Sequence, residues 1–228
     1  MKLVVFGDSW PYGDELVDPA RANQNCHSLE NESYRLSHGY PGLIAQHFGL
    51  ELVNLARCGN SLQGMQYALS WWSHQPEYND SFMLFSLPFM HRMSWINPEW
   101  HQQGGSNFLE RLWHSSWIKQ NSVDVDSDIK QLHQIWTARV SSALQDFHHV
   151  NIAANFFAGF CHMRSIPYLM HHVFDEAFQA DFTDPELTLE TILLNTGLFH
   201  ANGHPNELGH KMIAEKLIYY IKHNKLLG

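Results

Sequence analysis

The chain is poor in cysteine, in basic residues and in long apolar runs, and each shortage excludes a class of protein. Its three cysteines, Cys26, Cys58 and Cys161, are widely spaced with no C-x-x-C pair, which disfavours both a disulfide framework and a zinc ribbon. Lys and Arg number 14 against 23 Asp and Glu, and the formal net charge of −9 disfavours a general nucleic-acid binder. No segment approaches about 18 consecutive apolar residues and no export signal is recognisable, so we expect a cytoplasmic protein without membrane partners.

Histidine, by contrast, is abundant. The chain has 17 histidines, more than its 14 lysines and arginines together, so its net charge depends strongly on pH. His200, His204 and His210 have a spacing that invites a metal site. However, Pro205 interrupts the helical face that a pair of zinc-binding histidines needs, and no cysteine or carboxylate completes the set. The sequence therefore predicts neither a metal nor an organic cofactor.

Apolar segments that alternate between strand-like and helix-like spacing predict the fold. Buried strands are expected at residues 3–6, 51–55, 81–87 and 150–155, and helices at 40–48, 61–73, 126–147 and 207–223. Strands alternating with helices are typical of a parallel sheet covered on both faces. We therefore expect one α/β domain over residues 1–228, in three α/β/α layers around a mainly parallel sheet. Two long insertions are expected, a polar loop at 13–39 and a tryptophan-rich section at 88–125.

The turn after the first predicted strand holds the best candidate for a nucleophile. Gly7-Asp8-Ser9 follows an apolar run, which places the Ser9 hydroxyl at the carboxyl edge of the sheet, where ligands of such folds bind. The backbone amides of the turn can point toward an anion, as a nucleophile with an oxyanion donor requires. Gly, Asp and Ser are also ordinary turn residues, so a purely structural turn is an equal alternative on these residues alone.

A serine nucleophile needs a base, and His204 is the histidine in the best position. It stands directly before the last predicted helix, with Pro205 expected at the first helical position and Glu207 in the first turn. The positive end of the helix dipole there disfavours the imidazolium form, which leaves the ring able to accept a proton. The alternative is a histidine that only forms a hydrogen bond within a helix-entry turn.

Gly7-Asp8-Ser9 and His204-Pro205-Asn206, at opposite ends of the chain, resemble the first and last motif blocks of the SGNH (GDSL) hydrolases. Residues 54–61 are similar to the second block, whose glycine, here Gly59, contributes an amide to the oxyanion hole. The resemblance implies a flavodoxin-like α/β/α fold and serine-hydrolase chemistry. The longer strings at 6–16 and 204–210 resemble the SGNH-like proteins of tailed bacteriophages.

Two positions depart from the pattern of that family. Residues 86–92, after the third predicted strand, lack the oxyanion-hole asparagine of the third block, so Asn60 and Arg92 become the candidate donors. The family's aspartate, three residues before the histidine, is replaced by Ala201. Asn202 is then a candidate to orient the His204 ring through its side-chain carbonyl. A neutral group stabilises an imidazolium less than a carboxylate does, so either the enzyme is slow or a distant acid takes part.

These residues predict a serine esterase that acts on small-molecule or carbohydrate esters, with carbohydrate deacetylation as the favoured subtype. Ser9, His204 and Asn202 are the expected catalytic residues, and Gly59, Asn60 and Arg92 the expected oxyanion or substrate-binding residues. The tryptophans of the second insertion, Trp95, Trp100, Trp113 and Trp117, are either a surface for stacking sugars or a small core of their own. The alternative function is a catalytically inactive SGNH-like module that binds carbohydrate or belongs to a virion.

Overall fold

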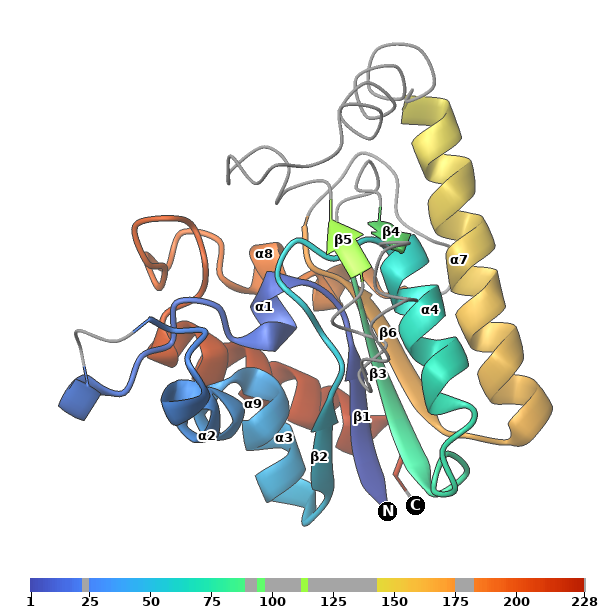
Figure 1. The fold of residues 1–228 in the computed structure, drawn as a ribbon, viewed down its shortest axis with the longest axis horizontal. Helices are drawn as coiled ribbons and strands as arrows, with labels where there is room; N and C mark the ends of the chain where they lie inside the picture. The colour runs from blue at the N-terminus through green and yellow to red at the C-terminus, as the bar shows by residue number, and fades with distance from the viewer. Residues whose placement is uncertain (22–24, 89–93, 97–111, 115–142, 175–182, 228) are drawn as a thin grey trace.

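A four-stranded parallel sheet forms the centre of the molecule (Figure 1). The computed structural model describes residues 1–21, 25–88, 94–96, 112–114, 143–174 and 183–227. The strands are β1 (Lys2–Phe6), β2 (Glu51–Asn54), β3 (Ser81–Leu87) and β6 (Tyr168–His172), in the spatial order β2-β1-β3-β6. Because all neighbours are parallel, the turns that follow these strands meet at one edge of the sheet.

Helices cover both faces of this sheet. Alternate residues of β1 point to opposite sides: Val4 and Phe6 pack with α4 (Leu62–Trp72) and α7 (Ala143–Arg164). Leu3 and Val5 pack with α3 (Tyr40–Phe48) and α9 (Glu207–His223). All four side chains are fully buried, as expected of a strand covered on both faces. The predicted three-layer α/β/α, flavodoxin-like fold is confirmed.

Short elements connect these layers. They are α1 (Ser9–Tyr12), the 3-10 turn η1 (Pro19–Arg21), α2 (Leu29–His38), the 3-10 turn η5 (Pro185–Leu187) and α8 (Leu189–Ile192). A separate antiparallel pair joins β4 (Ser94–Ile96) to β5 (Leu112–His114) and sets Trp95 opposite Trp113. Trp100 and Trp117 lie outside the described residues.

One predicted strand is wrong. Residues 150–155 belong to α7, and the fourth strand is β6, which begins at Tyr168. The buried positions Val150, Ala153, Ala154, Phe157 and Cys161 recur at three- and four-residue steps, which is helical spacing. Periodicity over six residues did not distinguish this segment from a strand. Most of the predicted helix at 126–147 lies outside the described residues.

Two smaller predictions also need correction. The segment 13–39 is not a loop throughout, because its second half forms α2. Pro205 precedes α9 instead of occupying its first position: Asn206 is the N-cap, and its side chain accepts a hydrogen bond from Gly209 N at 3.0 Å. Glu207 does lie in the first turn, as predicted.

Gly7, at the end of β1, is required by a close approach of neighbouring atoms. A Cβ at this position would lie 2.5 Å from Pro11 Cγ and 2.9 Å from Ser86 Cβ. We expect Gly7→Ala to lower the free energy of unfolding by about 1–3 kcal/mol, the usual cost of overpacking a core. Gly159→Ala in α7 is the matched control, since a Cβ there has nothing within 4 Å and alanine favours a helix. Urea unfolding midpoints should therefore move in opposite directions for the two variants, and a Gly7→Ala midpoint equal to the wild type would contradict the crowding.

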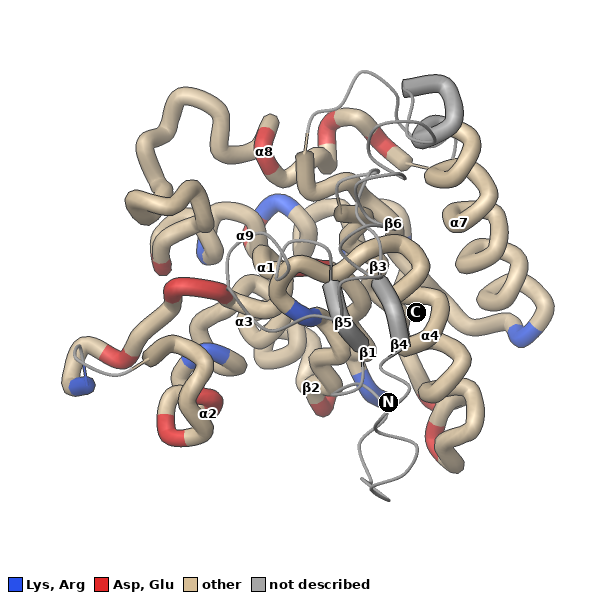
Figure 2. Tube along the Cα trace, turned by 45° about the horizontal axis from the view of Figure 1, so that its top comes forward, with Lys and Arg blue, Asp and Glu red and all other residues tan. Residues whose placement is uncertain are grey.

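The described surface is not dominated by positive charge. Figure 2 shows Lys and Arg scattered singly over the described elements, interspersed with Asp and Glu. Within these same ranges, no helix combines the length and the apolar character that crossing a bilayer requires.

Candidate active site

Ser9 lies at the point where β1 gives way to α1, at the carboxyl edge of the sheet. Asp8 is the N-cap of this short helix, and its carboxylate accepts a hydrogen bond from Trp10 N at 3.2 Å. The helix ends at Gly13, whose φ of 81° is left-handed, and Ser9 O accepts hydrogen bonds from the amides of Gly13 and Asp14. Ser9 is only 5 % exposed. The turn therefore fixes the backbone on both sides of the candidate nucleophile.

The turn after β2 lies directly against the Ser9 turn. Gly7 O accepts two hydrogen bonds from it, from Arg57 N at 3.1 Å and from Asn60 Nδ2 at 2.9 Å. Between these two donors lies Gly59, in the left-handed region with φ of 70°. Within the described part of the chain, neither Ser9 N nor Gly59 N donates to any group. Two amides without partners on adjoining turns suit the geometry of an oxyanion hole.

Asn60 connects the two turns. Its side chain is almost fully buried, its Nδ2 donates to Gly7 O, and its Oδ1 accepts from Ser61 N at 3.0 Å. Asn60 is therefore engaged in holding the turns together. Its role as an oxyanion donor stays a prediction, and Arg92, the other predicted donor, lies outside the described residues.

His204 sits in a tight turn ahead of α9. Phe199 and Pro205 form an antiparallel bridge, His200 N donates to His204 O at 2.8 Å, and Gly203 adopts a φ of 87°. The His204 side chain is 21 % exposed. The turn therefore holds the imidazole at the surface, beside the loop that follows α1.

Glu15, from that loop, contacts the ring. Glu15 Oε2 lies 2.8 Å from His204 Nδ1, and Glu15 Oε1 accepts a hydrogen bond from Asn202 Nδ2 at 2.7 Å. Glu15 is a non-glycine residue with a φ of 66°, held by a hydrogen bond from its own amide to Asp14 Oδ1 at 3.1 Å. Glu15 and His204, which lie 189 positions apart in the chain, therefore form a carboxylate–imidazole pair, and the Asn202 amide holds the carboxylate by a hydrogen bond.

Asn202 thus lies where the sequence placed it but contacts a different partner. It was expected to orient His204 through its side-chain carbonyl, whereas its amide donates to Glu15. The sequence did not single out Glu15, although the residue belongs to the string 6–16 that carries the family resemblance. A carboxylate therefore contacts His204 although position 201 holds alanine.

Ser9 and His204 are not hydrogen-bonded to each other in the described part of the chain. His204 Nε2, the nitrogen opposite Glu15, instead faces Asp14 Oδ2 at 3.6 Å. Catalytic hydrogen bonds are often long in the absence of substrate and tighten when it binds. Proton transfer from Ser9 would require Nε2 to turn from Asp14 toward the Ser9 hydroxyl.

Cys58, one residue before Gly59, is not a competing nucleophile. Burial raises the pKa of its thiol well above the ordinary range, and the nearby Asp14 carboxylate raises it further. The reactive form of cysteine is the thiolate, which this environment disfavours.

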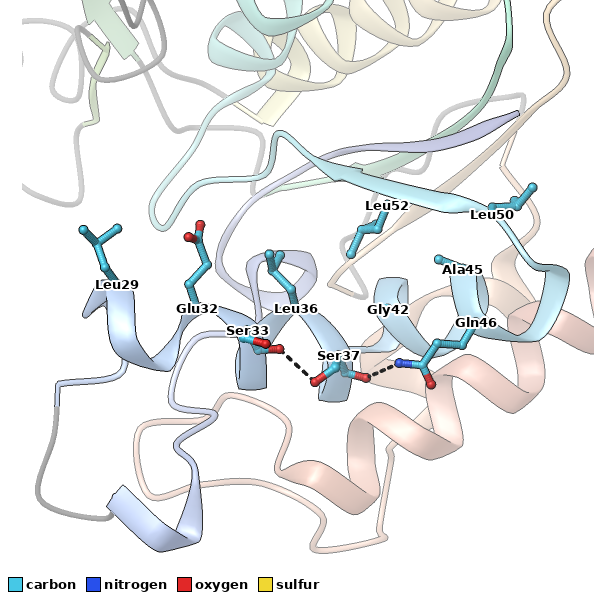
Figure 3. A pocket seen from close by; sticks show the side chains of 10 residues that line it. All are labelled: Leu29, Glu32, Ser33, Leu36, Ser37, Gly42, Ala45, Gln46, Leu50 and Leu52. Carbon is cyan, nitrogen blue, oxygen red and sulfur yellow. Dashed lines mark hydrogen bonds between the residues drawn. The ribbon is translucent and has the colours of Figure 1, made fainter.

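The cavity drawn in Figure 3 is separate from these residues. It has a volume of about 510 Å³ and lies among α2, α3 and the start of β2, lined by residues such as Leu36, Ala45 and Leu52. None of its lining residues belongs to the candidate site, and its walls carry no pair of groups suited to acid–base chemistry.

No protein-family model and no curated protein matches the sequence. Among solved structures, the chain is similar to TesA at 13 % identity, with 100 % of both chains covered and a TM-score of 0.53. It also aligns with the psychrotrophic esterase EstA from Pseudoalteromonas sp., at 11 % identity over 97 % of each chain with a TM-score of 0.48. A catalytic mutant of Axe2, an acetylxylan esterase from Geobacillus stearothermophilus, aligns at 14 % identity over 96 % of this chain and 93 % of that one, with a TM-score of 0.46. The likeness to TesA shows a shared fold over the whole length of both chains.

Proposed function

We propose that the chain is a serine esterase of the SGNH (GDSL) type, in which Ser9, His204 and Glu15 act as nucleophile, base and acid. The observation that carries the proposal is the 2.8 Å contact between His204 Nδ1 and Glu15 Oε2. It supplies the carboxylate that the chain lacks at the family's usual position. The motif blocks around Ser9 and His204 support the same assignment.

The proposed reaction proceeds in two steps. Ser9 Oγ attacks the acyl carbon while its proton passes to His204 Nε2, and the proton then goes to the leaving alcohol. Water, deprotonated by the same nitrogen, releases the acyl group from Ser9. The amides of Ser9 and Gly59 would hold the oxyanion, and Asn60 or Arg92 would add a side-chain donor. Glu15 stabilises the imidazolium, and Asn202 positions Glu15.

The favoured substrates are small acyl esters, with acetylated carbohydrates as the first class to screen. EstA and Axe2 are esterases, and Axe2 is an acetylxylan esterase. Trp95 in β4 and Trp113 in β5 are paired positions of the antiparallel strands. Both belong to the tryptophan-rich segment for which sugar stacking is one interpretation of the sequence.

A catalytically inactive SGNH-like module that binds carbohydrate or belongs to a virion is the second candidate. The observation that favours it is the absence of a hydrogen bond between Ser9 and His204, which leaves the serine without its base in this structure. The missing third-block asparagine points in the same direction.

Labelling with a fluorophosphonate distinguishes the two candidates. An activated Ser9 Oγ displaces fluoride from phosphorus, so we expect one phosphonyl group on Ser9 by peptide mass spectrometry. Ser9→Ala should take up none, whereas Ser73→Ala, at the exposed end of α4, should be labelled like the wild type. Wild-type protein that stays unlabelled and does not hydrolyse p-nitrophenyl acetate would favour the inactive module.

A further inference from the structure

Three residues from separate segments converge beside His204 without a part in the proposed reaction. Asp14 follows α1, His27 precedes α2, and Cys58 lies in the turn after β2. One oxygen, nitrogen or sulfur atom from each lies within 4.8 Å of the other two. The carboxylate is the centre of the group, with Oδ1 at 3.3 Å from His27 Nε2.

We propose that Asp14, His27 and Cys58 bind a zinc-class divalent cation, and that the bound ion inhibits the esterase. A thiolate, an imidazole and a carboxylate are the three ligand types of protein zinc sites, with bonds of about 2.0–2.3 Å. Two ligands of one tetrahedral ion at such bond lengths lie roughly 3.3–3.8 Å apart, so the Asp14–His27 separation already fits. Cys58 Sγ lies within 4.8 Å of the other two ligand atoms and would close to about 3.8 Å or less on binding. The ion displaces the thiol proton, which leaves to solvent, and an exchangeable water fills the fourth position. The proposal departs from the sequence-based expectation of no metal.

The surrounding contacts hold the three ligands in place. Asp14 N donates to Ser9 O at 3.0 Å, which fixes the carboxylate next to the nucleophile turn. The His27 ring lies against the Tyr12 ring, with centroids 5.7 Å apart, and His27 N donates to Asn25 Oδ1 at 2.9 Å. Cys58 is hydrogen-bonded to Asp14. Each ligand is therefore positioned by groups other than the ion.

The inhibition rests on the proposed function and on the Asp14 carboxylate, which contacts both the proposed metal site and His204. Asp14 Oδ2 lies 3.6 Å from His204 Nε2, so a cation on Asp14 would sit close to the nitrogen that must accept the serine proton. The positive ion opposes the imidazolium charge that forms in the reaction. His204 Nε2 can also displace the water from the fourth coordination position, which removes the lone pair of the base.

Cobalt(II) tests the binding without any turnover, because cobalt–thiolate bonds absorb in the near ultraviolet. We expect wild-type protein to show this band on titration with CoCl₂, and zinc to abolish it. Cys58→Ser should lose the band, and His27→Ala should weaken cobalt binding about 100-fold or more. Cys161→Ser, at a buried thiol within α7, and His74→Ala, at an exposed imidazole after α4, are the matched controls and should keep wild-type binding.

The two parts of the proposal fail separately. A wild type without the band, or variants at 27 and 58 that keep it, would overturn the site whether or not the chain is an esterase. If the band appears, ZnCl₂ should lower p-nitrophenyl acetate hydrolysis at least tenfold in the wild type and far less in His27→Ala. Equal inhibition of both would overturn the regulatory part. Absence of hydrolysis in the metal-free wild type would count against the proposed function and leave the spectroscopic result standing.

Discussion

Glu15→Gln should lower kcat for p-nitrophenyl acetate by about 10³-fold while leaving the fold intact. In serine hydrolases, replacing the buried acid by its amide costs up to about 10⁴ in kcat, because the histidine is held in the wrong tautomer. Here the tautomer can be derived from the neighbours. Asn202 Nδ2 donates to Glu15 Oε1, so the glutamine carbonyl would stay with Asn202 and its NH₂ would face His204 Nδ1. That ring would then carry its proton on Nε2 and could not accept one from Ser9.

Several variants distinguish this role from a structural one. Glu15→Ala removes the charge without forcing the tautomer, so it should keep more activity than Glu15→Gln. Asn202→Ala should lower kcat about tenfold, because the Glu15 carboxylate remains but loses the hydrogen bond from Asn202 that positions it. Glu30→Gln, at an exposed carboxylate in the first turn of α2, is the control for a lost charge and should behave like the wild type. Thermal unfolding should show the same Tm within a few degrees for all of them. Wild-type kcat in Glu15→Gln would refute the assignment of Glu15 as the acid.

The sequence predicted the elements whose apolar pattern is long and regular. The range of β3 matches the predicted strand residue for residue, and so do α3 and α9, because each buries one continuous apolar stripe or run. The helix α2 was missed for the opposite reason. Its buried side chains, Asn31 and Arg35, are polar. Asn31 Nδ2 donates to Leu16 O in the loop after α1, and Arg35 Nη1 donates to Tyr12 O at the end of α1, so neither packs in an apolar core. Only Leu29, Tyr34 and Leu36 of its ten residues are apolar or aromatic, too few to indicate a helix packed on an apolar core.

The sequence predicted those residues of the candidate site that belong to short local motifs. Ser9, Gly59 and His204 each sit in a turn that the sequence itself specifies, through a strand end, a glycine or a helix entry. Glu15 could not be assigned in that way. Its contact with His204 depends on the left-handed backbone at position 15 and on Arg35 Nη1, which donates to Tyr12 O at 2.7 Å and fixes the loop. Neither is visible in a short pattern, and only the folded chain brings residues 15 and 204 together.

Mild acid should destabilise this protein, through three of its seventeen histidines. Burial lowers the pKa of His171 and of His172 to about 4, and that of His210 to about 3. The hydrogen bond of the His210 ring agrees, since its Nδ1 accepts from Tyr40 N at 3.2 Å and a proton on that nitrogen would face another donor. His171 Nε2 lies 3.0 Å from the Ser86 hydroxyl, which is also bonded to Tyr40.

The sign of the effect follows from proton binding. Below about pH 6.5 the unfolded chain protonates these three side chains while the folded chain does not, so the unfolded state binds more protons and stability falls as the pH is lowered. The stability is intact above pH 7 and is lost progressively from about 6.5 toward 4. At pH 5 each histidine costs about 2 kcal/mol, and three of them take away much of the roughly 5–15 kcal/mol of an ordinary domain.

Urea unfolding followed by tryptophan fluorescence between pH 8 and pH 5 measures this loss above the range in which most carboxylates titrate. We expect a constant midpoint down to about pH 7 and a steep decrease below it. His210→Gln keeps an acceptor for Tyr40 N but cannot take up a proton, so its midpoint should fall less steeply, whereas His74→Ala should follow the wild type. A midpoint that is the same at pH 8 and pH 5 would mean that the buried imidazoles do not control acid stability. The expected result would instead place the pH sensitivity of this histidine-rich chain in three buried rings, at the end of β6 and in α9.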